Sequence, residues 1–156
     1  MRACLLLGSN LGERAVLLAQ ARTFIEQDCG ALVKVSAVYE TEPVGFSADT
    51  MFLNQALLIE TSRSPQALLA QCLQIERNMG RIRPMNPAVA YCSRNIDIDI
   101  LFYEDTICEC PELTLPHPRL HLRAFALKSL ADVAPDWRHP ILGLTAKELL
   151  KRLDFD

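Results

Sequence analysis

The sequence predicts an α+β protein with a ferredoxin-like split βαβ core, in which a mostly antiparallel sheet is covered by helices and followed by extra C-terminal elements. Two observations support this class. Segments with strand and helix periodicity follow one another in the order strand, helix, strand, strand, helix, strand. Half of the 156 residues are hydrophobic and 22% are charged, which is ordinary for one folded domain spanning residues 1–156.

The first half of the chain predicts three strands and one helix. An apolar strand ends in a turn at Gly8, and Asn10 with Glu13 three residues later resembles a helix capping box. Pro43 and Gly45 interrupt a later alternating pattern and indicate a loop. The expected elements are a strand at 3–7, a helix through 17–25, a strand at 33–40, a loop at 41–49 and a strand at 52–61.

The second half predicts a helix, a long loop, another strand and C-terminal helices. Ser64 before Pro65 marks a helix start, and Gly80 marks its end. Residues 81–94 have no clear period, and long irregular loops in compact domains are often functional. The expected elements that follow are a strand at 95–103, a turn near 104–105, a short strand around 107, a helix at about 120–133 and a last helix that starts at Thr145 with Glu148 in a second capping box.

The segment Asn95-Ile96-Asp97-Ile98-Asp99-Ile100 alternates carboxylates with isoleucines. In a strand Asp97 and Asp99 share one face, roughly 6 to 7 Å apart. At an effective dielectric near 20 they would repel by about 2 to 3 kcal/mol, and a divalent cation such as Mg²⁺ would relieve this repulsion. The alternative is an edge strand with a solvated acidic face.

Arginines gather around the long loop. Arg77, Arg81, Arg83 and Arg94 occur between residues 77 and 94 without an acidic residue among them, although the chain carries a net charge of −3. A second stretch free of acids, residues 117–128, contains His117 and Arg123. Arginine binds phosphate through paired donors, so metal-binding carboxylates with arginines from two segments indicate phosphoryl transfer. Each arginine taken singly could also be a solvated surface charge.

Charge and composition exclude several classes of protein. The acidic net charge gives no general basic field for nucleic acid. The apolar run at residues 3–7 is too short for a signal peptide or a membrane span, so we expect a cytoplasmic protein without a membrane partner. No obligate protein partner is evident from the sequence. The six cysteines are scattered without a Cys-x-x-Cys pair, which favours reduced thiols, and Cys4 and Cys72 are expected in the core.

A set of motifs in order along nearly the whole chain resembles the 6-hydroxymethyl-7,8-dihydropterin pyrophosphokinase family. These motifs are Gly8-Ser9-Asn10, Tyr39-Glu40-Thr41-Glu42-Pro43-Val44-Gly45, Phe52-Leu53-Asn54, Glu76 with Gly80-Arg81-Ile82-Arg83, Arg94 to Leu101, and Leu115-Pro116-His117-Pro118-Arg119-Leu120 with Arg123 and Phe125. The resemblance implies a folate-biosynthesis enzyme that moves the β,γ-diphosphate of ATP to the hydroxymethyl group of the reduced pterin and releases AMP.

The resemblance also implies roles for individual residues. Asp97 and Asp99 would hold two Mg²⁺ ions, and the catalytic residues would be Arg81, Arg94 and Asp97. The residues expected to bind ATP are Glu76, Arg81, Arg83, Arg94, Ile98, His117 and Arg123. The residues expected to bind the pterin are Thr41, Glu42, Pro43, Val44, Phe52, Asn54, Tyr91 and Phe125.

Two other functions remain open at this stage. A noncatalytic ferredoxin-like module could bind RNA on its sheet, but only 6% of the residues are aromatic and one strand presents two carboxylates. Another metal-dependent phosphotransferase or phosphohydrolase would share the aspartates and arginines but would not need residues 41–54 to bind the edge of a pterin.

Overall fold

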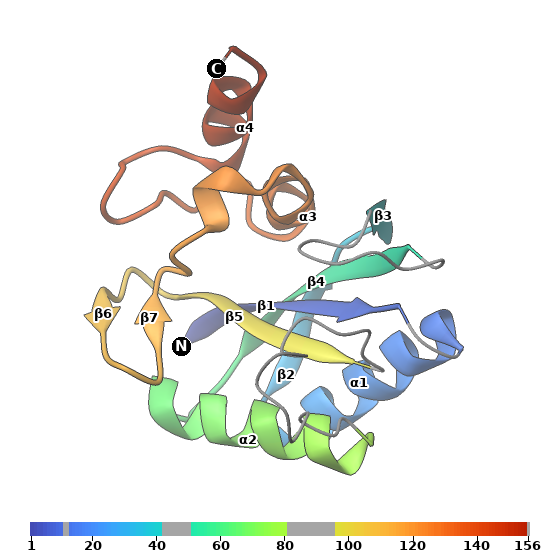
Figure 1. Ribbon diagram of the computed structural model, residues 1–156. Helices are drawn as coiled ribbons and strands as arrows, with labels where there is room; N and C mark the ends of the chain where they lie inside the picture. The colour runs from blue at the N-terminus through green and yellow to red at the C-terminus, as the bar shows by residue number, and fades with distance from the viewer. Residues whose placement is uncertain (11–12, 42–50, 81–95, 156) are drawn as a thin grey trace.

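The central sheet has the strand order β2-β4-β1-β5, with β3 also paired to β4 (Figure 1). The computed structural model describes residues 1–10, 13–41, 51–80 and 96–155. All pairings in this sheet are antiparallel. Its strands are β1 (Arg2–Ser9), β2 (Ala31–Val35), β3 (Tyr39–Thr41), β4 (Phe52–Glu60) and β5 (Asp97–Tyr103). This order and these directions are those of a split βαβ core, so the predicted fold class is confirmed.

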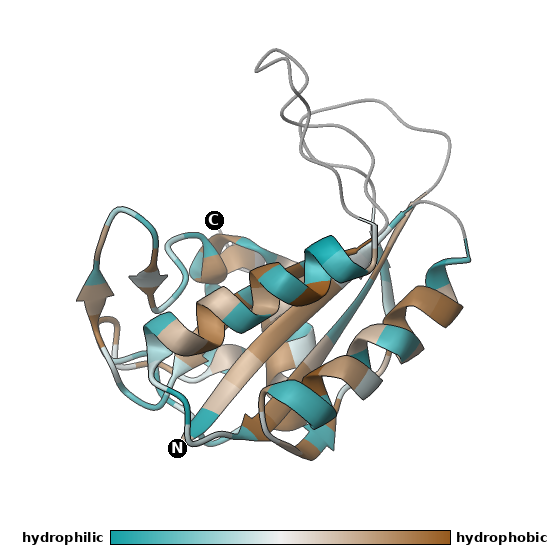
Figure 2. Ribbon diagram, turned by 90° about the horizontal axis from the view of Figure 1, so that it is seen from below, coloured by the Kyte–Doolittle hydropathy of each residue, from teal (hydrophilic) through white to brown (hydrophobic). Residues whose placement is uncertain are grey.

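Two helices cover one face of the sheet. Figure 2 shows α1 (Arg14–Asp28) and α2 (Pro65–Asn78) lying across the strands. Their buried apolar residues belong to one core with residues of the sheet. Ser64 caps α2, since its side chain accepts a hydrogen bond of 3.2 Å from the Ala67 N–H, as the Ser-Pro sequence predicts. The core on this face includes Leu5, Leu7, Ile25, Leu57, Ile75, Ile98 and Ile100.

The first of the two C-terminal helices covers the other face. There α3 (Ala124–Val133) packs on β2, β3 and β4, and α4 (Ala146–Phe155) packs on α3 (Figure 1). A 3-10 turn, η2 (Leu120–Leu122), precedes α3, and the short strands β6 (Cys108–Glu109) and β7 (Thr114–Leu115) form a separate hairpin. The core on this face includes Cys4, Leu6, Leu58, Leu101, Leu127 and Leu130.

The single strand predicted at 33–40 was wrong in extent. The structure instead has β2 and β3, separated at residues 36–38. The Ser36 hydroxyl accepts a hydrogen bond of 2.8 Å from the Ala56 N–H, and the Gln55 amide donates to the Ser36 carbonyl at 2.9 Å. Side-chain groups therefore replace part of the backbone ladder and interrupt the strand, which alternation of residue types alone does not reveal.

One of the two predicted capping boxes was wrong. The helix α1 begins at Arg14 with Glu13 as its N-cap, and the Glu13 side chain makes no capping hydrogen bond, while Asn10 is buried after the end of β1. The box at the last helix is confirmed: the Glu148 N–H donates to the Thr145 hydroxyl and the Thr145 N–H donates to Glu148, each at 3.3 Å.

The helix predicted at about 120–133 and the short strand predicted near Ile107 are both shifted. The first is divided into η2 and α3, because Arg123 between them has an extended backbone. The second begins at Cys108. Cys4 and Cys72 are buried as expected. Within the described parts of the chain, every helix is too short or too polar to cross a bilayer.

Candidate active site

The two aspartates lie on the face of the edge strand β5 that points away from α1 and α2. Ile98 and Ile100 alternate with them and belong to the core beneath α1 and α2, so the two-residue period of the strand places Asp97 and Asp99 on the opposite face. Both aspartates are half-buried. The sequence prediction that the carboxylates share one face of a strand is confirmed.

A row of paired residues links the aspartate strand to β4. Gly8 of β1 pairs with Asn54 on one side and with Asp97 on the other. Residues paired in an antiparallel sheet share a face, so Asn54, Gly8 and Asp97 form one row across three strands. The outer two lie two strand spacings apart, roughly 9 to 10 Å. The expected metal ligand and the expected pterin ligand therefore belong to the same face of the sheet.

Asn54 is held in a fixed orientation. Its side-chain Nδ2 donates to the Thr41 hydroxyl at 2.7 Å and to the Tyr39 carbonyl at 3.3 Å, and the side chain is buried. Since both hydrogens of Nδ2 are directed at β3, the Oδ1 atom lies on the other side of the amide, toward Gly8: a Cβ added to Gly8 would lie 3.4 Å from it. The structure thus brings Thr41 and Asn54, two of the expected pterin-binding residues, into direct contact.

An aromatic ring borders the same row. Phe52 is two residues from Asn54 on β4, and its Cδ1 atom would lie 3.7 Å from the added Gly8 Cβ. Phe125 lies at the start of α3, where the Arg123 guanidinium is 6.0 Å from the centre of its ring. Both residues are half-buried.

The Glu76 carboxylate contacts β5, the strand that carries the two aspartates. Glu76 lies in α2 and is 3% exposed, and its Oε2 accepts a hydrogen bond of 2.8 Å from the Ile98 N–H. Ile98 stands between the two aspartates. Glu76 and Ile98, both expected to bind ATP, are thus in direct contact with each other.

His117 and Arg123 come to the acidic strand from the segment between β7 and α3. The His117 N–H donates to the Leu101 carbonyl of β5 at 2.9 Å. Burial, followed by the charges of Arg123 and Arg119, lowers the pKa of His117 to about 4, while Asp97 acts in the opposite direction. His117 is therefore a neutral imidazole near pH 7, and its electrostatic neighbours include the arginines and Asp97.

The hydrogen bonding of His117 fixes its neutral form. The Nδ1 atom accepts a hydrogen bond of 3.2 Å from the Arg119 N–H, so the single ring proton belongs on Nε2. His117 therefore presents an N–H donor to its surroundings, without a positive charge.

A contact between α3 and β3 was not predicted from the sequence. The Asp132 carboxylate of α3 accepts hydrogen bonds from the Tyr39 hydroxyl at 2.7 Å and from the Ala37 N–H at 3.2 Å. This contact joins α3, which contains Phe125, to β3, which contains Thr41. Spacing alone gave no signal for it, because the partners are 93 and 95 residues apart.

The remaining expected site residues lie outside the described residues. They are Glu42, Pro43, Val44, Arg81, Arg83, Tyr91 and Arg94.

The described residues offer some, but not all, of the ligands that a Mg²⁺ ion needs. Asp97 and Asp99 offer carboxylate oxygens, which hard cations prefer. Among the residues that the structure describes, no three carboxylate, imidazole or thiol groups are grouped so that they could hold a metal ion by themselves. A magnesium ion that takes its other ligands from water and substrate phosphates fits this arrangement.

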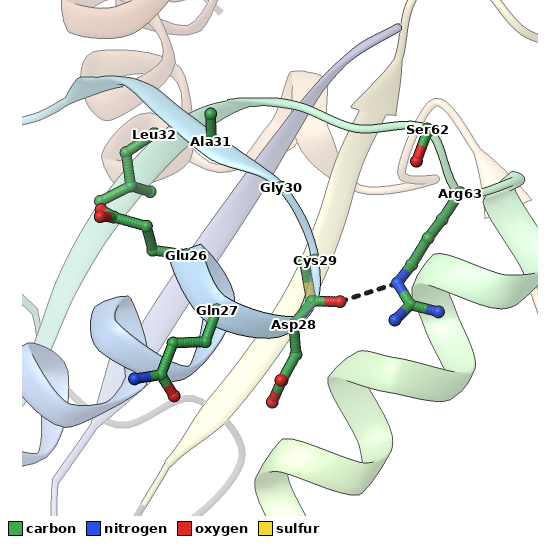
Figure 3. Close-up of a pocket in the computed structure, with 9 residues that line it drawn as sticks. All are labelled: Glu26, Gln27, Asp28, Cys29, Gly30, Ala31, Leu32, Ser62 and Arg63. Carbon is green, nitrogen blue, oxygen red and sulfur yellow. Dashed lines mark hydrogen bonds between the residues drawn. The ribbon is translucent and has the colours of Figure 1, made fainter.

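A different depression lies at the far end of the sheet. Figure 3 shows it between the end of α1, the start of β2 and residues 62–63, with a volume of about 620 Å³. The Arg63 Nε donates to the Asp28 carbonyl at 2.7 Å, so backbone already binds part of this guanidinium. The depression is at the Glu60 end of β4, six residues or roughly 20 Å along the strand from Asn54. It is separate from the row of site residues.

Taken together, the split βαβ fold and the row of carboxylate, glycine and amide on one sheet face define a domain suited to metal-dependent phosphotransfer. Comparison with known proteins identifies the family. The sequence profile of 7,8-dihydro-6-hydroxymethylpterin-pyrophosphokinase (HPPK) matches residues 4–135. This chain belongs to that family.

Several relatives share the family name. Proteins called 2-amino-4-hydroxy-6-hydroxymethyldihydropteridine pyrophosphokinase are 43% identical in Porphyromonas gingivalis, over 86% of this chain and 90% of that protein, and 42% identical in Methylorubrum extorquens, over 98% and 94%. The Bacillus subtilis protein of this name is 41% identical over 84% of this chain and 77% of its own length.

Solved structures support the fold. A Plasmodium falciparum HPPK-DHPS structure with pteroate superimposes with a TM-score of 0.77 at 18% identity, and covers 97% of this chain. The chain spans only 42% of that longer protein. The similarity at this identity concerns the fold alone.

Proposed function

We propose that this chain, as one domain over residues 1–156, transfers the β,γ-diphosphate of ATP to the hydroxymethyl group of 6-hydroxymethyl-7,8-dihydropterin and releases AMP, a reaction of folate biosynthesis. Family membership gives the reaction class. The observation that supports it most directly is the row Asn54, Gly8, Asp97, because it offers an amide for a heterocycle and a carboxylate for a metal on one sheet face. We also propose that the enzyme acts in the cytoplasm, on these two small molecules.

The pterin is proposed to bind at the Asn54 end of the row. Pterin rings carry N–H donors, and the fixed Oδ1 of Asn54 is an acceptor turned toward Gly8. Phe52 and Phe125, which are half-buried, supply aromatic surface for a flat ring. Thr41, Glu42, Pro43 and Val44 would bind the ring edge, and Tyr91 would cover the ring against Phe125.

The nucleotide is proposed to bind at the Asp97 end. Asp97 and Asp99 would hold two Mg²⁺ ions, which when bound supply neutralisation of the phosphate charge. Arg81, Arg83, Arg94 and Arg123 would bind phosphate oxygens, with Arg81 and Arg94 closest to the transferred group. Such fixed positive groups stabilise charge that spreads over the phosphoryl oxygens in the transition state.

His117 is proposed to contribute a neutral donor. With Nδ1 already bonded to the Arg119 N–H, its Nε2–H is the group available for a phosphate or ribose oxygen. The low pKa keeps this donor uncharged at neutral pH, so its contribution is orientation and not charge. Glu76 accepts the Ile98 N–H, and Ile98 is proposed to meet the nucleotide through its backbone.

The decisive experiment identifies the nucleotide product. Protein, Mg²⁺, ATP and 6-hydroxymethyl-7,8-dihydropterin are incubated, and nucleotides are separated by ion-exchange chromatography. We expect AMP together with the pterin diphosphate, with no reaction when the pterin is omitted. ADP as the product would indicate a different phosphotransferase and would overturn the proposal.

A further inference from the structure

Gly8 occupies the middle of the row between the two proposed half-sites. Its paired neighbours are Asn54 on β4 and Asp97 on β5. A substrate joined at one end to Asn54 and at the other to phosphates near Asp97 must pass over this residue.

The structure does not need glycine here for folding. Glycine inside a strand costs about 0.5 to 1 kcal/mol relative to alanine, and it usually marks a bulge, a special backbone angle or a close approach by another group. The pairing of β1 with β4 is regular through Gly8, and its pairing with β5 is regular from Leu5 to Gly8, where it ends. The described glycines with positive φ are Gly80 and Gly143. The first two reasons therefore do not apply to Gly8.

The residues that the structure describes also leave room for an added methyl group. A Cβ on Gly8 would lie 3.4 Å from Asn54 Oδ1 and 3.7 Å from Phe52 Cδ1, both ordinary contact distances. Gly30 is a contrast, because its Cβ would lie 2.2 Å from the Glu60 carbonyl oxygen, where a side chain is impossible without movement of the backbone. Close approach by a ligand is the reason that remains for Gly8.

We propose that Gly8 is a specificity-determining residue: its lack of a side chain keeps open the strip of β1 over which the hydroxymethyl arm of the substrate passes from the ring edge at Asn54 toward the phosphates at Asp97. This inference rests on the proposed function. The atoms nearest to an added Cβ belong to Asn54 and Phe52, so the methyl group would occupy space on the pterin side of the row and leave the nucleotide side free.

The test is Gly8→Ala, with binding measured apart from turnover. Isothermal calorimetry gives the affinity for a nonhydrolysable ATP analogue with Mg²⁺, then for the pterin in its presence. We expect pterin affinity to fall about 10- to 200-fold, the range for one misplaced methyl group in a pocket, and analogue affinity to stay within twofold. Thermal unfolding should show a midpoint equal to or above that of the wild type, because alanine is the better strand residue.

Two comparisons sharpen the result. The loss should be smaller for 7,8-dihydropterin, which lacks the hydroxymethyl arm, than for the substrate. Gly143→Ala is the matched control: Gly143 has φ of 72° in the turn before α4 with nothing within 4 Å of an added Cβ, so this variant should lose stability while pterin affinity is kept.

Each contrary outcome has a definite meaning. Unchanged pterin affinity in a folded Gly8→Ala protein overturns the inference, as does equal weakening of the ATP analogue and the pterin. An equal loss for the pterins with and without the arm overturns the assignment to the arm. If the wild type binds the pterin but forms no AMP, the proposed function fails, while the binding comparison still decides the role of Gly8.

Discussion

The buried carboxylate of Glu76 accepts a hydrogen bond of 2.8 Å from the backbone N–H of Ile98, the residue between the two aspartates. A helix on one face of the sheet thus holds the strand whose other face carries the carboxylates. Glu76 is buried, so a loss of its carboxylate would leave the Ile98 amide without this acceptor and without ready access to water.

Glu76→Ala should therefore destabilise the fold as well as weaken nucleotide binding. We expect a loss of about 1 to 3 kcal/mol in the free energy of unfolding, measured by urea titration, because a buried amide loses its partner. Glu76→Gln is the control, since its amide oxygen can still accept the hydrogen bond, and it should lose less than half as much. Equal losses in the two variants would show that charge, and not the hydrogen bond, is what matters.

Asp97→Asn should lower turnover strongly while the fold is kept. The amide has nearly the same size as the carboxylate but lacks the charge that would hold Mg²⁺. We expect a decrease of roughly 100-fold or more in kcat, the scale seen when one electrostatic contact to a transition state is removed. Asp105→Asn, in an exposed turn after β5, is the control and should have wild-type kcat. Near-normal turnover of Asp97→Asn would remove this carboxylate from the mechanism.

The low pKa of His117 predicts a loss of stability in acid. The imidazole is protonated near pH 6.5 in the unfolded chain but only near pH 4 in the folded protein. Below pH 6.5 the unfolded state binds the extra proton, so the contribution of His117 to stability is present above that pH and is lost as pH falls toward 4. Between pH 7.5 and pH 5 the loss from this residue should be about 2 kcal/mol.

The measurement compares wild type with His117→Gln by urea unfolding at the two pH values. The variant lacks the titrating group, so its stability should fall less over the same interval. Parallel decreases would assign the acid sensitivity to other groups, among them His139, whose pKa is also lowered by burial.

The contact between Asp132 and Tyr39 should be visible in the titration of the tyrosine. The hydrogen bond from the Tyr39 hydroxyl to the carboxylate, with some burial and the negative charge, raises the pKa of Tyr39 above its usual value of 10. Asp132→Asn removes the charge, so the pKa of Tyr39 should fall toward 10 in an ultraviolet titration of tyrosinate. Tyr39→Phe identifies which part of the absorbance change belongs to this residue.

The same variant tests whether the contact positions the pterin site. Asp132 joins α3 to β3, which carry Phe125 and Thr41 respectively, so Asp132→Asn should raise the KM for the pterin several-fold and leave the KM for ATP unchanged. An unaltered KM for the pterin would limit Asp132 to a role in stability.

Sequence patterns correctly predicted features that depend on interactions between residues close together in the chain. The face shared by Asp97 and Asp99 follows from the period of a strand, and the cap at Thr145 follows from bonds within four residues. The same reasoning failed at Asn10, where the sequence of a capping box is present but the helix begins only at Arg14. Asn10 is instead buried, three residues before the N-cap at Glu13.

Contacts between distant segments were beyond sequence reasoning. The partners of Glu76 and Asp132 lie 22 and more than 90 residues away, and nothing in the spacing of either residue identifies them. The sequence predicted a turn at Gly8, which was wrong, because Gly8 lies within β1. Its place between Asn54 and Asp97 depends on the register of two strand pairings. Only the assembled sheet reveals that register.

The strand order has a consequence for folding. Gly8, Asn54 and Asp97 become neighbours only when β1 has paired with both β4 and β5, and these contacts close loops of 46 and 89 residues. Contacts between residues so far apart in the sequence form slowly. The site is complete only when the last of these three strands has paired. Recovery of substrate binding during refolding therefore reports the closure of the whole sheet, and partly folded chains that lack the β1–β5 pairing should bind neither substrate.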